Sequence, residues 1–357
     1  MEKILIPFFI SFLIALFSTP LTIKFARKYG LVDDPSKRPH PAHIQNRIVP
    51  RAGGLSLYLA IIIPLLVFIP LSKSVAGIIL GLSLLLLIGL LDDYLKNLSP
   101  FPRLGIQFLA ALIVVASGVG ITFTTNPFGG ILRLDEIIWT INFLGTHTII
   151  VIADLFALIW ITGMMNMINW ANGVDGQTPS IVIVAAVVIG ILSFRLFQAG
   201  DPNQLTIALI AFITAGACLG FQIFHWYPAK IFLGFAGTTI LGFLIATLSI
   251  MSGAKLATAL LVLLIPAIDF GYTVIRRIVS KKSPFFGDQQ HLHHLLLKRG
   301  WSHSQIALFY FVTSAVLGFA AINLESAGKL FTVVGAGTIV LGVILWLHLF
   351  YKKPEIS

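Results

Sequence analysis

Residues 74–93 read SVAGIILGLSLLLLIGLLDD, an apolar run that ends in the adjacent aspartates Asp92 and Asp93. The run is long enough to cross the hydrocarbon core of a bilayer as one helix. Two neighbouring carboxylates at the end of such a helix repel each other and lose hydration, and the helix dipole adds negative charge if the chain runs toward them. A cation would relieve this repulsion, and an oxygen-rich site suits Mg²⁺. The alternative is a helix that simply ends there, with a solvated acidic pair.

The rest of the chain shares this apolar character. It has 357 residues, of which 57% are hydrophobic and only 11% are charged. A soluble fold of this length needs more charge to cover its surface, so the composition predicts an all-α polytopic membrane protein. The single cysteine, Cys218, cannot form an internal disulfide. No A-x-A-like cleavage site follows the N-terminal apolar stretch, so we expect a retained helix there.

About eleven stretches are apolar and long enough to be transmembrane helices, within a single domain that covers residues 1–357. They are residues 4–26, 53–71, 75–92, 104–124, 148–168, 180–198, 204–224, 237–252, 255–275, 304–323 and 329–350. An odd number of spans places the two termini on opposite sides of the membrane. The connection over residues 125–147 is long enough for a small hairpin.

The cationic residues predict the orientation. Eighteen of the 24 Lys and Arg residues fall in one set of loops and six in the other, and loops rich in these residues stay on the cytoplasmic side. The N-terminus is then outside, the C-terminus is cytoplasmic, and Asp92 and Asp93 lie at the cytoplasmic end of their helix. This bias also explains the formal charge of +10 without a nucleic acid partner. The cytoplasmic loops are about 28–52, 93–103, 169–179, 225–236 and 276–303.

Polar residues gather in these cytoplasmic loops. The first loop holds Lys37, Arg38 and Arg47, which could bind a phosphate-bearing ligand or a lipid headgroup, or could form an ordinary positive-inside loop. The fifth span ends in Asn166 and Asn169, one helical turn apart. Amides at a membrane boundary are costly unless they bind something. They therefore favour a polar ligand, such as a nucleotide base or sugar, over a simple turn.

The turn after the fifth span and the start of the eighth are rich in glycine. Residues 172–176 read NGVDG and include Asp175, and residues 225–239 read HWYPAKIFLGFAGTT. Asn-Gly and Asp-Gly pairs form tight turns. At the start of the eighth span, free backbone N–H groups could meet a phosphate. A glycine-rich helix start packed against a neighbouring helix is an equal alternative there.

Residues 288–300 read DQQHLHHLLLKRG and predict a short cytoplasmic helix. Asp288 is a candidate N-cap, and Gly300 is a candidate C′ residue just past the end of the helix. The histidines, His291, His293 and His294, favour hydrogen bonds to a diphosphate over a zinc site, because no cysteine lies near them and Asp288 is the only close acid. A solvated polar helix is the alternative.

Together and in this order, these segments resemble the polyprenyl-phosphate N-acetylhexosamine-1-phosphate transferase family, from Gly30 to Gly300. The HLHH sequence at residues 291–294 is more similar to the branch that uses UDP-N-acetylglucosamine (the WecA/TagO branch) than to the branch of peptidoglycan synthesis. The resemblance implies that a polyprenyl phosphate such as undecaprenyl phosphate attacks a UDP-N-acetylhexosamine. UMP is released, and the product is the first lipid-linked intermediate of a cell-envelope polysaccharide.

The resemblance also implies the cofactor, the location and the residues of the site. Mg²⁺, or else Mn²⁺, is the cofactor, the protein lies in the bacterial plasma membrane, and a homodimer is left open. Asp92 and Asp93 correspond to the acidic pair that binds metal and deprotonates the lipid phosphate. Asn169 and Asp175 correspond to residues near the metal and the uracil. The implied substrate-binding residues are Lys37, Arg38, Arg47, Asn166, Asn172, Gly173, Asp175, His225, Phe232, His291, His293 and His294.

The chain also departs from the family pattern. Gly234-Phe235 stands where the family has Gly-Asp, and a phenylalanine cannot bind Mg²⁺. Three further differences are Asn172-Gly173 in place of Asp-Gly, His225 in place of Asn, and Gln289 in place of Arg or Lys. These changes keep a non-catalytic binding or scaffold protein open as an alternative. A transporter is a third reading, but transporters tend to place polar sites near mid-bilayer, whereas these lie at one edge.

Overall fold

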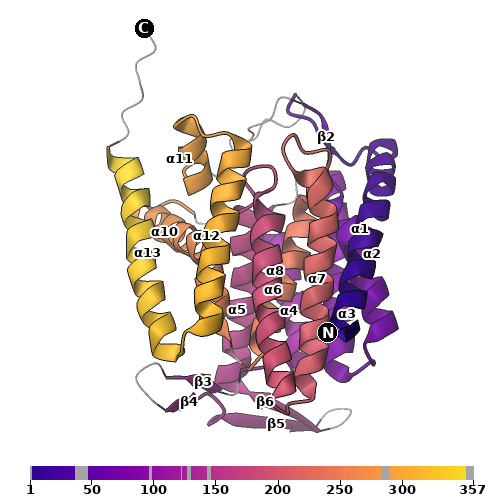
Figure 1. The fold of residues 1–357 in the computed structure, drawn as a ribbon, viewed down its shortest axis with the longest axis vertical. Coiled ribbons are helices and arrows are strands. Elements are labelled where there is room, and N and C mark those ends of the chain that lie inside the picture. Colours follow the sequence, from indigo (N-terminus) through magenta and orange to yellow (C-terminus); the bar gives the residue numbers. More distant parts are fainter. Residues whose placement is uncertain are drawn as a thin grey trace.

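The computed structural model describes residues 2–36, 47–95, 99–121, 123–126, 130–142, 146–253, 255–283 and 289–350. Within these ranges the chain forms a bundle of helices with short strands at its two ends (Figure 1). The helices are α1 (Glu2–Lys28), α2 (Gly53–Phe68), α3 (Lys73–Leu95), α4 (Pro100–Ala116), α5 (Val151–Trp170), α6 (Gln177–Gln198), α7 (Asn203–His225), α8 (Gly234–Met251), α9 (Leu256–Val262), α10 (Leu264–Val279), α11 (Leu292–Lys298), α12 (His303–Asn323) and α13 (Ser326–Leu349). The strands are β1 (Val32–Asp33), β2 (Val49–Pro50), β3 (Phe123–Thr125), β4 (Ile131–Arg133), β5 (Ile138–Asn142) and β6 (Thr146–Ile150).

Eight helices in the described ranges are long and apolar enough to cross a membrane, namely α1, α3, α5, α6, α7, α8, α12 and α13. The pair α9 and α10 passes the same test as one bent span, which raises the number to nine. The helices α2 and α4 are also apolar, but they have only 16 and 17 residues. The chain is therefore a polytopic α-helical membrane protein, as its composition predicts.

Local signals explain why α2 and α4 end earlier than predicted. Ile69 precedes Pro70 and is extended, with φ −120° and ψ 124°, because a residue before proline disfavours the helical region. The helix α4 starts at Pro100 and ends before Gly118, whose φ of +98° stops the helix. The predicted spans 53–71 and 104–124 are thus wrong at their C-terminal ends, since α2 ends at Phe68 and α4 at Ala116.

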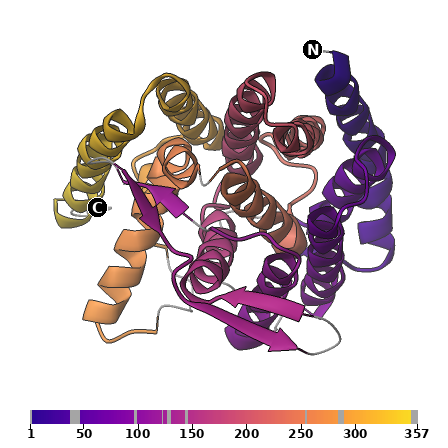
Figure 2. The ribbon, with the colours of Figure 1, turned by 90° about the horizontal axis from the view of Figure 1, so that it is seen from below.

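The predicted span over residues 255–275 is broken into two helices. The helices α9 and α10 meet at an angle of 89°. Pro266 lacks the backbone N–H that would bond to the carbonyl of Val262, so the hydrogen-bond ladder is interrupted at this point. Figure 2, in which most helices are seen nearly end-on, shows α10 lengthwise because it lies across the bundle.

The helix α8 is the centre of the bundle. It is almost wholly buried, and it packs against α2, α3 and α5 (Figure 2). Glycines allow this close packing. A Cβ atom on Gly54 of α2 would lie 2.5 Å from Cβ of Ala236, and one on Gly89 of α3 would also meet Ala236. The starts of α2 and α8 are thereby held next to the last turns of α3.

The two ends of the bundle differ in character. At one end β3 pairs with β4 and β5 pairs with β6, both antiparallel, so the predicted hairpin region holds two strand pairs. At the other end lie α11 and the β1–β2 pair (Figure 1). The helix α11 begins at Leu292 with His291 as its N-cap. The predicted cap, Asp288, lies outside the described residues.

Candidate active site

The acidic pair is buried and paired with arginines. Asp92 and Asp93, in the last turn of α3, are each 1% exposed. Oδ1 of Asp92 accepts a hydrogen bond from Nε of Arg103 at 2.8 Å and forms an ion pair with Nη2 of the same guanidinium at 2.7 Å. Oδ1 of Asp93 accepts from Nε of Arg51 at 2.8 Å and from the backbone N–H of Phe235 at 3.1 Å. The solvated helix end considered above is therefore excluded.

Arg51 is placed by the backbone on either side of it. It pairs with Phe232 in a short parallel bridge, and the N–H of Phe232 donates to the carbonyl of Pro50 at 2.8 Å. Burial opposes the charge of this guanidinium, but the negative charges of Asp93, Asp33 and Asp92 raise its pKa above the ordinary value. Arg51 is thus a permanent cation beside Asp93.

One oxygen of each aspartate remains free. Oδ2 of Asp92 and Oδ2 of Asp93 are buried and have no hydrogen-bond partner among the described residues. A buried carboxylate oxygen without a partner is costly, and a cation or a proton would satisfy it. Mg²⁺ is commonly bound by one or two carboxylates, with waters and substrate phosphates completing its shell. The two free oxygens fit that donor set.

The other two predicted metal ligands already have partners. Oδ1 of Asn169 accepts a hydrogen bond from the hydroxyl of Thr238 at 2.8 Å. Oδ2 of Asp175 accepts from Nη2 of Arg47 and from the N–H of Ala229, both at 2.9 Å. In the described part of the chain, no three His, Cys, Asp or Glu side chains form a group that could hold a metal. Metal binding by Asn169 and Asp175 stays a prediction.

The first turns of α8 connect the acidic pair with the amides of α5. The N–H of Phe235 binds Asp93, and the hydroxyl of Thr238, one turn later, binds Asn169. One turn earlier on α5, Nδ2 of Asn166 donates to Oε1 of Gln107 and to the carbonyl of Thr162, both at 2.8 Å. Asp93 of α3 and Asn169 of α5, which are far apart in the sequence, are thus brought together at the start of α8.

The histidine helix packs against the turn after α5. A Cβ atom on Gly173 would collide with the imidazole of His293, so a side chain at this position would push the two segments apart. The ring centroids of His293 and His294 are 4.3 Å apart, and those of His291 and His293 are 5.6 Å apart. Burial, with the nearby His294 and His291, lowers the pKa of His293 well below its ordinary value. His293 is therefore a neutral imidazole at pH 7.

Asp269 of α10 holds the start of this helix. Its Oδ2 pairs with Nδ1 of His291 at 2.7 Å, and its Oδ1 accepts the N–H of Leu292 at 2.9 Å. Trp170, the last residue of α5, lies beside this pair. The guanidinium of Arg277 is 4.8 Å from its ring centroid, and the His291 ring is 5.9 Å away. These contacts connect α5, α10 and α11.

We expect Asp269→Ala to destabilise this corner of the protein. The substitution leaves the buried N–H of Leu292 without its acceptor, which costs about 1–3 kcal/mol. It leaves Nδ1 of His291 with only the hydroxyl of Thr273, 3.5 Å away. Thermal unfolding in detergent should show a lower Tm. Asp135→Ala, at an exposed ion pair with Arg133 on the strand end, is the matched control. Equal Tm values for the two variants would contradict this role.

The remaining predicted residues lie in two connections. His225 and Phe232 border the loop between α7 and α8, where Nδ1 of His225 is 2.9 Å from the carbonyl of Ile231 and the two rings meet edge to face at 6.3 Å. Asn172 lies in the turn between α5 and α6, and its N–H donates to the carbonyl of Asn169 at 3.4 Å. Substrate binding by these residues stays a prediction. Lys37 and Arg38 lie outside the described residues.

Sequence reasoning missed Arg51 and Arg103 as site residues. Both were visible only as members of cationic loops, and nothing local to either arginine shows which carboxylate it will meet. One sequence feature does point to Arg103. It lies in the first turn of α4, the helix that directly follows α3, so the chain reversal places it near the end of α3.

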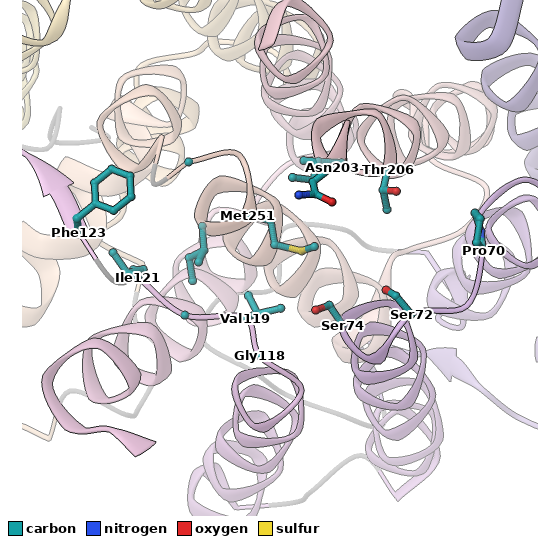
Figure 3. Close-up of a pocket in the computed structure, with 14 residues that line it drawn as sticks. Pro70, Ser72, Ser74, Gly118, Val119, Ile121, Phe123, Asn203, Thr206 and Met251 are labelled. Carbon is teal, nitrogen blue, oxygen red and sulfur yellow. The ribbon is translucent and has the colours of Figure 1, made fainter. Parts of the chain in front are cut away.

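A cavity of about 570 Å³ lies away from this site. Ser72, Ser74, Gly118, Asn203 and Met251 are among its lining residues (Figure 3). Ser74 is in the first turn of α3 and Asp92 in its last, so the helical rise separates the cavity from the acidic pair by roughly 27 Å. This cavity does not contribute to the acidic site.

Comparison with known proteins assigns the family. The chain is 28% identical to the probable undecaprenyl-phosphate N-acetylglucosaminyl 1-phosphate transferase of Bacillus subtilis (strain 168), over 92% of this chain and 86% of that protein. It is 27% identical to the decaprenyl-phosphate N-acetylglucosaminephosphotransferase of Mycolicibacterium smegmatis, over 96% and 88%. It is 29% identical to the phospho-N-acetylmuramoyl-pentapeptide-transferase of Corynebacterium kroppenstedtii, over 91% and 98%. Residues 75–253 match the sequence profile of Glycosyl transferase family 4, and the chain belongs to this family.

Proposed function

We propose that this protein transfers N-acetylglucosamine 1-phosphate from its UDP-sugar to a polyprenyl phosphate and releases UMP. The observation that carries the proposal is the buried pair of Asp92 and Asp93, each held by an arginine on one oxygen and free on the other. The names of the relatives, two of which specify this reaction, support it. The product is a lipid-linked sugar diphosphate that starts a cell-envelope polysaccharide.

This reaction requires the protein to position its substrates and to neutralise charge, more than to form covalent bonds with them. An oxygen of the lipid phosphate attacks the β-phosphorus of the UDP-sugar, the bond from that phosphorus to the bridging oxygen breaks, and UMP departs. Phosphoryl transfer of this kind depends on alignment and on electrostatic stabilisation. Arg51 and Arg103 supply fixed positive charge beside the carboxylates, and the free oxygens of Asp92 and Asp93 can accept a proton from the lipid phosphate.

The residues present would hold Mg²⁺ through Asp92 and Asp93, and the ion, when bound, supplies positive charge to the phosphates. The three histidines of α11 and its N-cap supply hydrogen bonds on the diphosphate side. We propose that the uridine binds beside the amide and acidic groups of α5 and the turn that follows it, which include Asn166 and Asp175. His293 is a neutral imidazole, so one ring nitrogen can donate a hydrogen bond and the other can accept one.

We also propose the membrane topology. Eleven spans result if α2, α4 and the bent pair α9–α10 are counted with the eight long helices. The cationic loops then lie in the cytoplasm with the acidic pair, where a UDP-sugar is available, and the N-terminus lies outside. The relatives are bacterial proteins, so the bacterial plasma membrane is the proposed location.

A UMP-release assay tests the proposed function. Purified protein in detergent, given undecaprenyl phosphate, Mg²⁺ and UDP-N-acetylglucosamine, should release UMP, and omitting either the lipid or the metal should stop the release. A panel of other UDP-sugars tests the choice of sugar. Absence of UMP with every UDP-sugar, from a preparation that is monodisperse and unfolds cooperatively, would contradict the proposal.

A non-catalytic scaffold is the second candidate, and Phe235 favours it. This residue offers only its backbone N–H to Asp93 and no metal ligand. A scaffold would bind UDP-N-acetylglucosamine in calorimetry without releasing UMP, and Phe235→Asp would then restore turnover. Uptake of UDP-sugar into proteoliposomes without chemistry would instead support a transporter.

A further inference from the structure

Phe235 contacts the surroundings of both aspartates. It is 4% exposed, and its backbone N–H donates to Oδ1 of Asp93 at 3.1 Å. The guanidinium carbon of Arg103 lies 5.4 Å from the centroid of its ring. Nε of the same guanidinium donates to Oδ1 of Asp92 at 2.8 Å, and Nη2 lies 2.7 Å from that oxygen in an ion pair. Arg103 is therefore held between a carboxylate and an aromatic face.

This arrangement suits the chemistry of arginine. The face of an aromatic ring carries partial negative charge and attracts a guanidinium, most strongly where water is partly excluded. The Arg103 side chain is 25% exposed and that of Asp92 is 1% exposed. Arg103 therefore lies between the buried aspartates and the protein surface. A stacked guanidinium keeps the N–H groups of its edge available for phosphate oxygens.

The local charges also balance without a third acid. Asp92 and Asp93 carry two negative charges, and Arg103 and Arg51 carry two positive charges in direct contact with them. Replacing the Phe235 ring by a carboxylate would add a second acceptor for Arg103 and draw its N–H groups away from a ligand. A ring fixes the position of Arg103 without using any of its hydrogen bonds.

We propose that Phe235 is a positioning residue whose ring holds Arg103 against Asp92, so that the guanidinium is preorganised to bind a phosphate of the sugar nucleotide. The inference rests on the proposed function where it is tested by kcat/KM. Its binding readout does not require turnover, because nucleotide affinity can be measured on the resting protein.

The test is a set of Phe235 variants with a double-mutant cycle. Phe235→Tyr keeps the aromatic face, whereas Phe235→Leu keeps an apolar side chain of similar size without it. We expect Phe235→Leu to weaken UDP-N-acetylglucosamine binding in calorimetry, and to lower kcat/KM, by about 10-fold, the scale of one cation–π contact. Phe235→Tyr should stay within about 2-fold of the parent protein, since it retains the contact.

The cycle separates positioning from packing. In an Arg103→Gln background, Phe235→Leu should have little further effect on binding or turnover, because the cation that the ring holds is gone. Equal affinities for the Leu and Tyr variants, or the same loss from Phe235→Leu in both backgrounds, would overturn the inference. If the parent protein binds nucleotide but never releases UMP, the proposed function fails, while the binding cycle still decides the role of Phe235.

Discussion

Replacing Asp92 or Asp93 with asparagine will reduce UMP release by at least about 100-fold, the scale seen when one preorganised electrostatic group is removed from an active site. Each substitution removes the negative charge and the free carboxylate oxygen that would accept a proton or contact a metal. Asparagine is nearly the same size, and its amide oxygen can still accept the arginine hydrogen bond. We therefore expect both variants to remain folded.

Stability and activity must be measured together for these variants. Loss of the carboxylate charge leaves Arg51 or Arg103 without its counterion, so some fall in Tm is expected. Asp135→Asn, in the exposed pair with Arg133 at the other end of the bundle, is the control and should keep full turnover. Near-normal turnover in both Asp92→Asn and Asp93→Asn would remove the acidic pair from the mechanism.

Gly234→Ala should be the most damaging small substitution at this site. Gly234 has a φ of +68°, a region that costs an L-residue roughly 1–2 kcal/mol. An added Cβ would also collide with Oδ2 of Asp93, and that carboxylate cannot move aside because Arg51 and the N–H of Phe235 hold it. We expect a large loss of turnover together with a lower Tm.

Gly342→Ala provides the matched control for that experiment. A Cβ at Gly342 of α13 meets no atom within 4 Å, and alanine is the better helix former. Its turnover should equal that of the parent protein, with an unchanged or slightly higher Tm. If Gly234→Ala behaves in the same way as Gly342→Ala, then Asp93 is not fixed as tightly as its contacts indicate.

The sequence predicts the parts of this structure that local patterns control. The apolar run before Asp92 identifies a membrane helix, because a bilayer imposes a length and a composition on each span. The polar residues at the ends of the spans follow from the same rule, since charged groups avoid the hydrocarbon. The family follows from the order of these segments, and the profile match over residues 75–253 confirms it.

The partners of these residues depend on contacts between distant segments. Arg51 lies between β2 and α2, whereas Asp93 lies on α3, and hydropathy does not show which arginine will approach which carboxylate. The helix α11 begins at Leu292, later than a cap at Asp288 would predict, for the same reason. Its first N–H is satisfied by Asp269 of α10, a tertiary contact, and not by a capping residue just before it in the chain. Pro266 was visible in the sequence, but the bend depends on how α10 packs.

The chemical identity of the lipid product decides whether the protein transfers N-acetylglucosamine 1-phosphate. Intact lipid should be extracted after incubating the purified protein with undecaprenyl phosphate, UDP-N-acetylglucosamine and Mg²⁺, and its mass measured. We expect undecaprenyl diphosphate carrying one N-acetylglucosamine, with an equal amount of UMP. Unchanged lipid, or a lipid that carries the sugar on a single phosphate together with released UDP, would contradict it.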